Sequence, residues 1–226
     1  MATVYAKGKP FTWSYSKLKN YAACPKKHWH VDIVKNVKEE ESEILTWGNQ
    51  VHDGLAKRLS KKIPLPPTMG EYNGVVSGIE RMPGKLFVEQ KYGLREDFSG
   101  CGYFDNNIWY RGIGDVVVVD HQRALIVDWK LGKVLEDSHQ LALMAACIFG
   151  HFPDVQQVDT VFMWLKFDAR THEVFTRKQM PEVWNAILPL VAQYKSAVEA
   201  QEFPAKPGGL CRRWCPVSTC PHHGEG

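Results

Sequence analysis

The chain has 226 residues, a net charge of +3 and 44% hydrophobic residues, a composition typical of a soluble globular protein with a substantial core. It contains no apolar run near the ~20 residues that a membrane span needs, and its start lacks the apolar core of a secretory signal. We therefore expect a cytoplasmic protein, in a bacterium or a phage-infected host. Basic residues cluster at 7–27, 57–62 and 212–213, which by itself is equally compatible with a solvated surface.

The first part of the chain predicts mostly helices. Residues 14–22 begin at a serine and end before a Cys-Pro pair, which predicts a short helix. Apolar residues recur at helical spacing over 43–60, which predicts a longer helix, and 73–81 has a similar character. A proline-rich connection at 62–70 separates these two helices.

The second part predicts a sheet. Alternating residues predict a strand over 85–92, and a glycine-rich loop at 93–107 follows it. A β-hairpin comes next, and beyond it the pattern predicts a helix over 136–149, strands over 158–167 and 172–177, and a helix over 181–201. This order predicts an α/β fold with a central mixed sheet flanked by helices.

The hairpin carries a pair of carboxylates. Two apolar runs, 116–119 and 124–127, flank a polar turn. A symmetric turn places Asp115 opposite Asp128, with Cβ atoms roughly 5 Å apart, and like charges so placed destabilise a sheet unless something compensates. A divalent cation would compensate. Because strand side chains alternate, Lys130 points to the same face as Asp128.

Four polar features around the hairpin each have two interpretations. Asp128 and Lys130 form either part of a site or a surface ion pair. His52 lies beside the apolar stripe of its helix, as a site residue or as a buried, satisfied histidine. Glu89 interrupts an apolar strand, as a site residue or as an edge-strand charge. Gln140 opens the helix after the hairpin, where it either caps that helix or reaches the site.

Together these features resemble a known superfamily. The chain carries, in order, G-x3-H from Gly48 to His52, G-x-G-D from Gly112 to Asp115, D-x-K from Asp128 to Lys130, and Gln140. This set resembles the RecB-type branch of the PD-(D/E)xK nucleases, which includes the nuclease domains of RecB and AddB, the CRISPR-associated adaptation nucleases and small phage exonucleases. The opening SYSKLKNYAACPKKHWH is also similar to the start of many members.

The resemblance implies a single nuclease domain over 1–226 with a restriction-endonuclease-like core over 43–201. It implies that Mg²⁺ or Mn²⁺ is held by His52, Asp115, Asp128 and the backbone carbonyl of Trp129. Lys130 would orient or deprotonate the attacking water. Glu89 would bind a second ion or its water, and Gln140 would contact DNA or the site. Members often carry Gln-x3-Tyr where this chain has Gln140 followed by Met144.

The function so implied is a metal-dependent DNA exonuclease acting on single strands or duplex ends. Two alternatives stay open: a catalytically idle DNA-binding or scaffold module, and a restriction-type or structure-specific endonuclease. DNA is the expected partner, with no membrane and with a recombination or replication protein as a further possible partner.

Four of the six cysteines lie near the chain ends: Cys24, Cys211, Cys215 and Cys220. Without an export signal, cysteines indicate metal or redox chemistry rather than disulfides. The resemblance implies that these four hold a [4Fe-4S] cluster, which joins 1–35 and 202–226 into one subregion. Thiolates suit zinc as well, with a histidine as a possible substitute ligand: His28, His222 or His223. Cys147 is expected in the core, and Cys101 has no assigned role.

Overall fold

The computed structural model describes residues 10–39, 42–135 and 137–225. The first lysines of the N-terminal basic cluster, Lys7 and Lys9, lie outside these residues, as does Glu136, the expected start of a helix. The chain divides into two compact units, which we call the sheet unit (Glu41–Val183) and the terminal unit (Met1–Glu40 with Trp184–Gly226). This division does not test the predicted boundaries of the nuclease core and of the cysteine subregion, which stay predictions.

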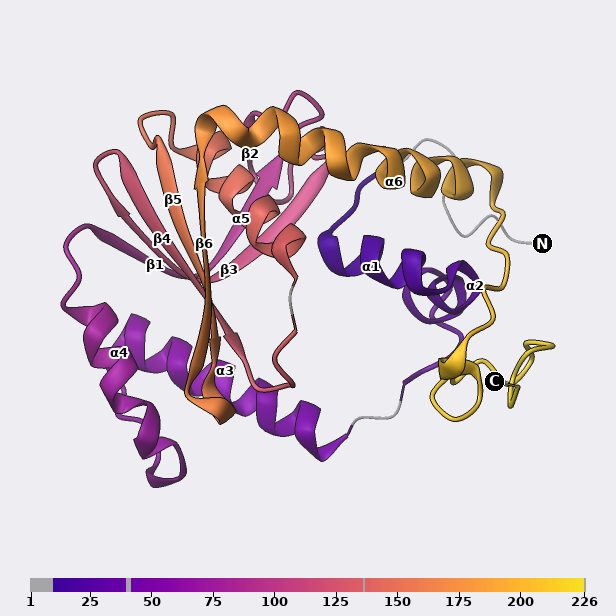
Figure 1. The fold of residues 1–226 in the computed structure, drawn as a ribbon, viewed down its shortest axis with the longest axis horizontal. Coiled ribbons are helices and arrows are strands. Elements are labelled where there is room, and N and C mark those ends of the chain that lie inside the picture. The colour runs from indigo at the N-terminus through magenta and orange to yellow at the C-terminus, as the bar shows by residue number, and fades with distance from the viewer. Residues whose placement is uncertain (1–9, 40–41, 136, 226) are drawn as a thin grey trace. The chain divides into compact units, whose positions relative to one another are not determined.

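The sheet unit contains a mixed sheet of six strands in the order β2-β1-β3-β4-β5-β6 (Figure 1). β4 and β5 run parallel, and all other neighbours are antiparallel. The strands are β1 (Lys85–Leu94), β2 (Gly100–Cys101), β3 (Tyr110–Asp120), β4 (Arg123–Lys130), β5 (Gln157–Trp164) and β6 (Ala169–Thr176). The prediction of an α/β fold with a mixed sheet is confirmed.

The predicted hairpin forms in the predicted register. Val119 lies opposite Ala124, and the ladder continues to Val116 opposite Val127. The pairing ends there, so Asp115 and Asp128 stand directly beyond the last hydrogen-bonded pair of the hairpin. Two carboxylates thus lie at its open end, and Asp128 continues in the parallel ladder of β4 with β5, opposite Phe162.

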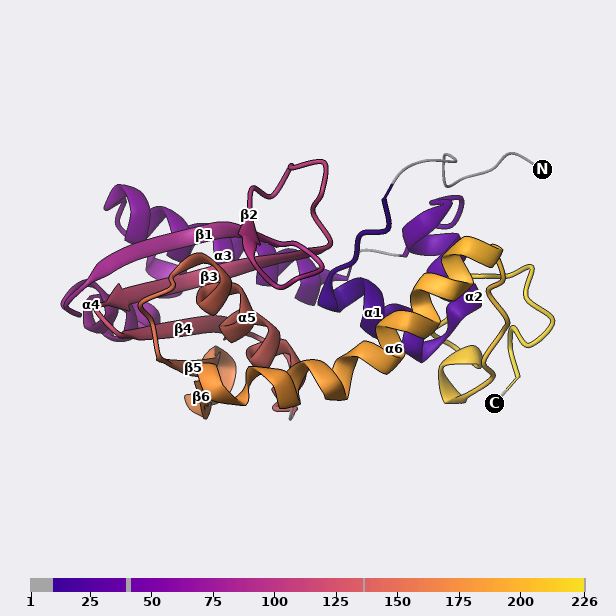
Figure 2. The same cartoon turned by 90° about the horizontal axis from the view of Figure 1, so that it is seen from above.

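Helices cover both faces of the sheet (Figure 2). On one face lie α3 (Glu43–Lys61), a 3₁₀ turn (Pro67–Tyr72) and α4 (Asn73–Glu80). Ser42 caps α3 by accepting a hydrogen bond from the amide of Leu45 at 3.2 Å. The apolar stripe of α3 is buried against β3 and β4 through its later members, Val51, Leu55 and Leu59. Its first member, Ile44, is 73% exposed, so the stripe leaves the core near the start of the helix.

On the opposite face, α5 (Ser138–His151) connects the parallel strands β4 and β5. Its residues from Leu141 to Phe149 are all buried. Parallel neighbours require such a crossover, and a helix that packs on the sheet supplies it. None of the helices in the described part of the chain is long and apolar enough to cross a membrane.

The terminal unit begins with the predicted helix, α1 (Tyr15–Ala23), capped by Ser14. It continues through α2 (Pro25–His28) and a π-helical turn (Trp29–Ile33), which the sequence patterns did not predict. The long helix α6 (Met180–Ala200) starts in the sheet unit and continues in the terminal unit, and a 3₁₀ turn (Gly209–Cys211) follows it.

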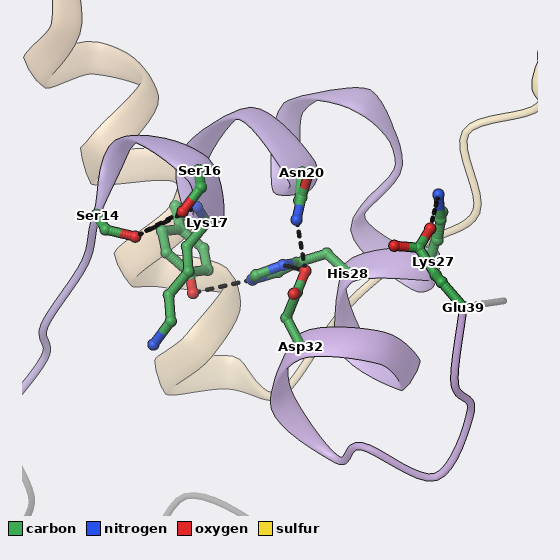
Figure 3. A network of polar contacts seen from close by, with 9 residues as sticks. Ser14, Ser16, Lys17, Asn20, Lys27, His28, Asp32 and Glu39 are labelled. Atoms are coloured by element: carbon green, nitrogen blue, oxygen red, sulfur yellow. Dashed lines mark hydrogen bonds and ion pairs between the residues drawn. The ribbon is translucent and has the colours of Figure 1, made fainter. Parts of the chain in front are cut away.

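A buried histidine organises the terminal unit. His28 is fully buried, and its Nδ1 lies 2.7 Å from Asp32 Oδ2, which also accepts a hydrogen bond from Asn20 at 2.9 Å (Figure 3). The other ring nitrogen lies 2.9 Å from the hydroxyl of Tyr194. Burial raises the pKa of Asp32, but the hydrogen bonds and charge from His28 and Asn20 outweigh it, and the net pKa is lowered.

Candidate functional site

Three side chains from three elements converge on one point of the sheet unit. His52 comes from α3, Glu89 from β1 and Asp115 from β3, and one potential ligand atom of each lies within 4.8 Å of the others. Carboxylate oxygens are the preferred ligands of hard divalent cations such as Mg²⁺ and Mn²⁺, and an imidazole is tolerated beside them. This trio is therefore a possible divalent-metal site.

The backbone of β1 is irregular at Glu89. Its φ of 50° lies in the left-handed region, which is uncommon for a residue other than glycine. Val88 pairs with Val116 and Gln90 with Gly114, so the pairing skips Glu89 and Asp115. Non-glycine residues in this region cost of order 1–3 kcal/mol and cluster at functional sites.

The alternation of side chains along β3 changes at the same place. Val116 belongs to the core under α3. A Cβ added to Gly114 would instead meet Val117 and Met144, on the side of α5. Residues two apart in a regular strand share a face, so the alternation of side chains shifts by one position at Asp115. The register of β1 with β3 is the same on both sides of this position, so neither strand contains an extra residue. Glu89 of β1 and Asp115 of β3 line the same cavity at this position. The sequence pattern did not predict the shift.

Asp115 and His52 are linked through the main chain of β4. Asp115 Oδ2 accepts a hydrogen bond from the amide of Trp129 at 2.9 Å and lies 3.4 Å from His52 Nδ1. The other ring nitrogen, Nε2, donates to the carbonyl of Trp129 at 3.0 Å. The carbonyl that the resemblance names as a metal ligand therefore lies beside His52.

Asp128, Lys130 and Gln140 form a closed set of polar contacts. Lys130 Nζ lies 2.7 Å from Asp128 Oδ2 and donates to Gln140 Oε1 at 3.1 Å. The amide nitrogen of Gln140 donates to Asp128 Oδ1 at 2.8 Å. The ring of Phe162 lies 4.7 Å below the ammonium. The side chain of Gln140 therefore contacts Asp128 and Lys130 at the end of β4.

The carboxylates perturb one another. Burial, reinforced by the charge of Asp115 and opposed by Lys130, raises the pKa of Asp128 to about 6. Burial and the charge of Asp115 also raise the pKa of Glu89. Burial lowers the pKa of His52, but the hydrogen bond and charge of Asp115 outweigh it and the net pKa is raised. The negative charge of the carboxylates in the site thus exceeds the positive charge of Lys130 and His52 beside them.

The trio of converging donors overlaps in part with the predicted metal ligands. Asp128, predicted as a ligand, is not in the trio and is engaged by Lys130 and Gln140. Glu89, predicted only for a second ion, belongs to the trio with His52. The left-handed backbone at Glu89 is not visible in the sequence pattern. These residues nevertheless line one cavity of about 880 Å³, whose charged and polar lining includes His52, Asp53, Glu89, Asp115, Asp128 and Lys130.

Glycines in the G-x-G-D motif let α5 approach the sheet. A Cβ on Gly112 would lie 3.1 Å from Met144 Sδ and 3.2 Å from Cys147 Sγ. A Cβ on Gly114 would lie 3.2 Å from Met144 Cε. Met144 is buried against the two glycines, which gives it a packing role. Cys147 is in the core as predicted, and burial raises the pKa of its thiol.

The four predicted cluster cysteines lie in the terminal unit. They line a cavity of about 10 Å³ together with His222: Cys24, Cys211, Cys215 and Cys220. Across the described residues, no three of their sulfur atoms come within 4.8 Å of one another, so a cluster geometry is not shown. The interpretation of His28 as a substitute ligand is not supported, because both its ring nitrogens are engaged by Asp32 and Tyr194. Cys101 is buried in β2.

Comparisons with known proteins address the fold. No family model matches the chain, and no curated protein sequence matches it. Among 21 matching chains of solved structures is a protein from Eubacterium rectale described as a putative exonuclease, with a TM-score of 0.51 and 13% identity over 90% of this chain and 86% of that chain. Another is SSO0001, with a TM-score of 0.43 and 11% identity over 97% and 91%. At such identities the first likeness concerns the fold alone.

Proposed function

We propose that this chain is a divalent-metal-dependent DNA nuclease of the PD-(D/E)xK type, acting as an exonuclease on single strands or duplex ends. The observation that carries the proposal is the convergence of His52, Glu89 and Asp115 at a cavity that also contains Lys130. The motif resemblance agrees with this assignment. So does the fold likeness to the protein from Eubacterium rectale described as a putative exonuclease.

The residues present fit a hard divalent cation. Four carboxylates line the cavity, those of Asp53, Glu89, Asp115 and Asp128. Burial and mutual repulsion raise the pKa of Glu89 and Asp128. Asp128 Oδ2 is buried and lies 2.7 Å from the ammonium of Lys130. A cation would relieve the repulsion in a way that one lysine does not. Asp128 and the carbonyl of Trp129 stand next to the trio as further ligands.

Bound Mg²⁺ or Mn²⁺ would supply Lewis-acid chemistry, polarising a phosphate and lowering the pKa of a water. The chain supplies positioning and charge. Lys130 is held by Asp128 and Gln140, so its ammonium is fixed in the cavity, where it orients the attacking water and stabilises charge on the phosphate. Groups already held in place stabilise a developing charge without reorganising during the reaction.

For the terminal unit we propose that Cys24, Cys211, Cys215 and Cys220 hold a [4Fe-4S] cluster. The four cysteines line one small cavity of the terminal unit, and thiolates are the usual ligands of such clusters. A brown protein with visible absorption and bound iron is the expected result. A colourless protein that releases zinc on unfolding would replace the cluster with a structural Zn²⁺ site.

End-labelled single-stranded and duplex DNA, incubated with Mn²⁺ or with chelator, tests the nuclease. We expect degradation from the ends with Mn²⁺, and a loss of about 100-fold or more in Asp115→Asn and Lys130→Ala. Asp159→Asn is the matched control, because Asp159 also lies 3.0 Å from a histidine, His172, in the same sheet. It should retain activity.

The other functions give other results. DNA that is bound but never degraded, under any divalent metal, would indicate the idle binding module. Cleavage of covalently closed circular DNA would indicate an endonuclease. Full activity of Lys130→Ala in Mn²⁺, or of the wild type in chelator, would contradict the proposed site.

A further inference from the structure

A cluster of aromatic and basic side chains lies on the sheet unit outside the metal-donor trio. Phe104 is 78% exposed, and its ring centroid lies 5.1 Å from that of Tyr103. Lys91 Nζ lies 5.5 Å from the ring of Tyr103 and 5.6 Å from that of Phe104. The guanidinium of Arg111 lies 5.4 Å from the ring of Tyr103 and donates to its carbonyl. We call these four residues the stacking patch.

The stacking patch and the donor trio share one face of the sheet. Gly112 and Gly114 face α5, so Arg111 and Ile113, which alternate with them, face the other side, where α3 contributes His52. Ile113 is 43% exposed there and pairs directly with Lys91. The side chains at this end of β1 and β3 are thus open to solvent.

The patch lies at a short distance from the trio. Lys91 follows Glu89 by two residues on β1, and Arg111 precedes Asp115 by four on β3. At ~3.3 Å per residue these separations are ~7 Å and ~13 Å along the strands. The loop that carries Tyr103 and Phe104 stands away from the sheet beside β2 (Figure 2).

The two cations of the patch contact rings rather than carboxylates. Within the residues that the structure describes, Lys91 contacts the two aromatic rings, and Arg111 contacts the ring and the carbonyl of Tyr103. Their charge is therefore available to a phosphate. An exposed aromatic face beside basic side chains is the combination that binds single-stranded nucleic acids, because every base presents a π-face and every linkage a negative charge.

We infer that the stacking patch binds an unpaired segment of the substrate strand, with a base on Phe104 and the flanking phosphates at Lys91 and Arg111. This inference rests on the proposed function, since the strand then leads toward the metal-donor trio. Bases inside a duplex are stacked on their neighbours and cannot use the ring of Phe104. The substrate segment at the stacking patch is therefore single-stranded, which includes the frayed end of a duplex.

Fluorescence anisotropy in chelator measures binding without cleavage. Labelled oligo(dT), oligo(U) and a blunt hairpin of the same length are the probes. We expect Phe104→Ala to weaken single-strand binding at least about fivefold, the lower end of the loss of one stacked base, and Phe104→Trp to restore it. Lys91→Ala should lower the salt dependence of log K by about 0.7, the release expected for one phosphate contact with a single strand.

Phe167→Ala is the matched control, because Phe167 is also exposed and has a lysine, Lys166, 6.0 Å from its ring. The Phe167→Ala variant should bind oligo(dT) and oligo(U) with the affinity of the wild type. Equal affinity of Phe104→Ala and wild type, equal losses in Phe104→Ala and Phe167→Ala, or equal binding of the hairpin would each overturn the inference. Equal losses on oligo(dT) and oligo(U) support it for both sugars, and a loss on one alone supports it for that strand.

Hydrolysis of bis(4-nitrophenyl) phosphate with Mn²⁺ separates this inference from the proposed function. That substrate is too small to reach the patch, so Phe104→Ala should hydrolyse it at the wild-type rate. A wild type that binds strands through Phe104 but hydrolyses nothing would contradict the nuclease and retain the patch. If the wild type hydrolyses the ester and Phe104→Ala has no effect on strand binding, the nuclease is retained and the stacking patch is contradicted.

Discussion

Because the backbone of Glu89 is left-handed, we expect glycine to be more stable than alanine at this position, whereas alanine is more stable than glycine in an ordinary strand. In a regular strand, glycine is about 0.5–1 kcal/mol less stable than alanine, because its unfolded chain is freer. At a φ of 50°, alanine instead carries a steric cost of ~1–2 kcal/mol that glycine avoids. Subtracting the entropic cost of glycine leaves Glu89→Gly roughly 0.5–1 kcal/mol more stable than Glu89→Ala.

Thermal unfolding in chelator, followed by far-ultraviolet circular dichroism, measures the difference. For a chain of this size, 1 kcal/mol shifts the Tm by about 2–4 °C, so the glycine variant should melt about 1–4 °C above the alanine variant. Glu89→Gln serves as a third variant, because it removes the charge and keeps the side-chain size. Both small-residue variants should bind Mn²⁺ more weakly than wild type by calorimetry. An alanine variant as stable as the glycine variant would refute the left-handed conformation and the re-aiming of Glu89.

Three further predictions concern packing, the buried histidine and the cysteines. Gly112→Ala should cost about 1 kcal/mol or more by crowding α5, and a double-mutant cycle measured by urea unfolding should show a smaller cost in the Met144→Ala background. Asp32→Asn should weaken the terminal unit by about 1.5–3 kcal/mol near neutral pH, since it removes a charge-assisted contact with His28. Because the folded-state pKa of Asp32 is lowered, its contribution is complete above its ordinary pKa and is lost as pH falls through the folded value, so the difference in Tm between wild type and variant should shrink below about pH 4. Cys220→Ser should lower the bound iron or zinc and the Tm together, and a variant with full metal content would exclude Cys220 as a ligand.

The regular parts of the site were predictable from the sequence. Two apolar runs and the polar turn between them predict the pairing of β3 with β4, and with it the placement of Asp115 and Asp128 at the open end of the hairpin. Helical periodicity fixes the face of α3 on which His52 lies. Lys130 and Gln140 follow from their positions at the end of a strand and the start of the next helix. These positions follow from regular secondary structure, which a sequence pattern can reveal.

The irregular parts were not predictable in the same way. The periodicity rules assume that alternation continues along a strand, and it shifts at Asp115. The left-handed φ of Glu89 has no signature in residue type, because glycine or asparagine would be the expected occupant. A carboxylate at such a position indicates that something other than backbone preference selects it. The π-helical turn after α2 escaped prediction for a related reason, since a single turn leaves too few residues to reveal a period.

The irregular backbone at Glu89 and Asp115 explains how two carboxylates at one end of a hairpin contact helices on opposite faces of the sheet. In an unbroken sheet, α3 and α5 would each contact their own face, and His52 and Gln140 would be separated by the backbone. Because β1 and β3 both deviate at the same rung, Asp115 engages His52 of α3 while Asp128, across the hairpin, engages Gln140 of α5. The left-handed backbone at Glu89 therefore lies at the rung where β3 turns Asp115 toward α3. Replacing Glu89 removes a metal donor whatever it does to the stability of the strand, so metal affinity and stability have to be measured separately for each variant.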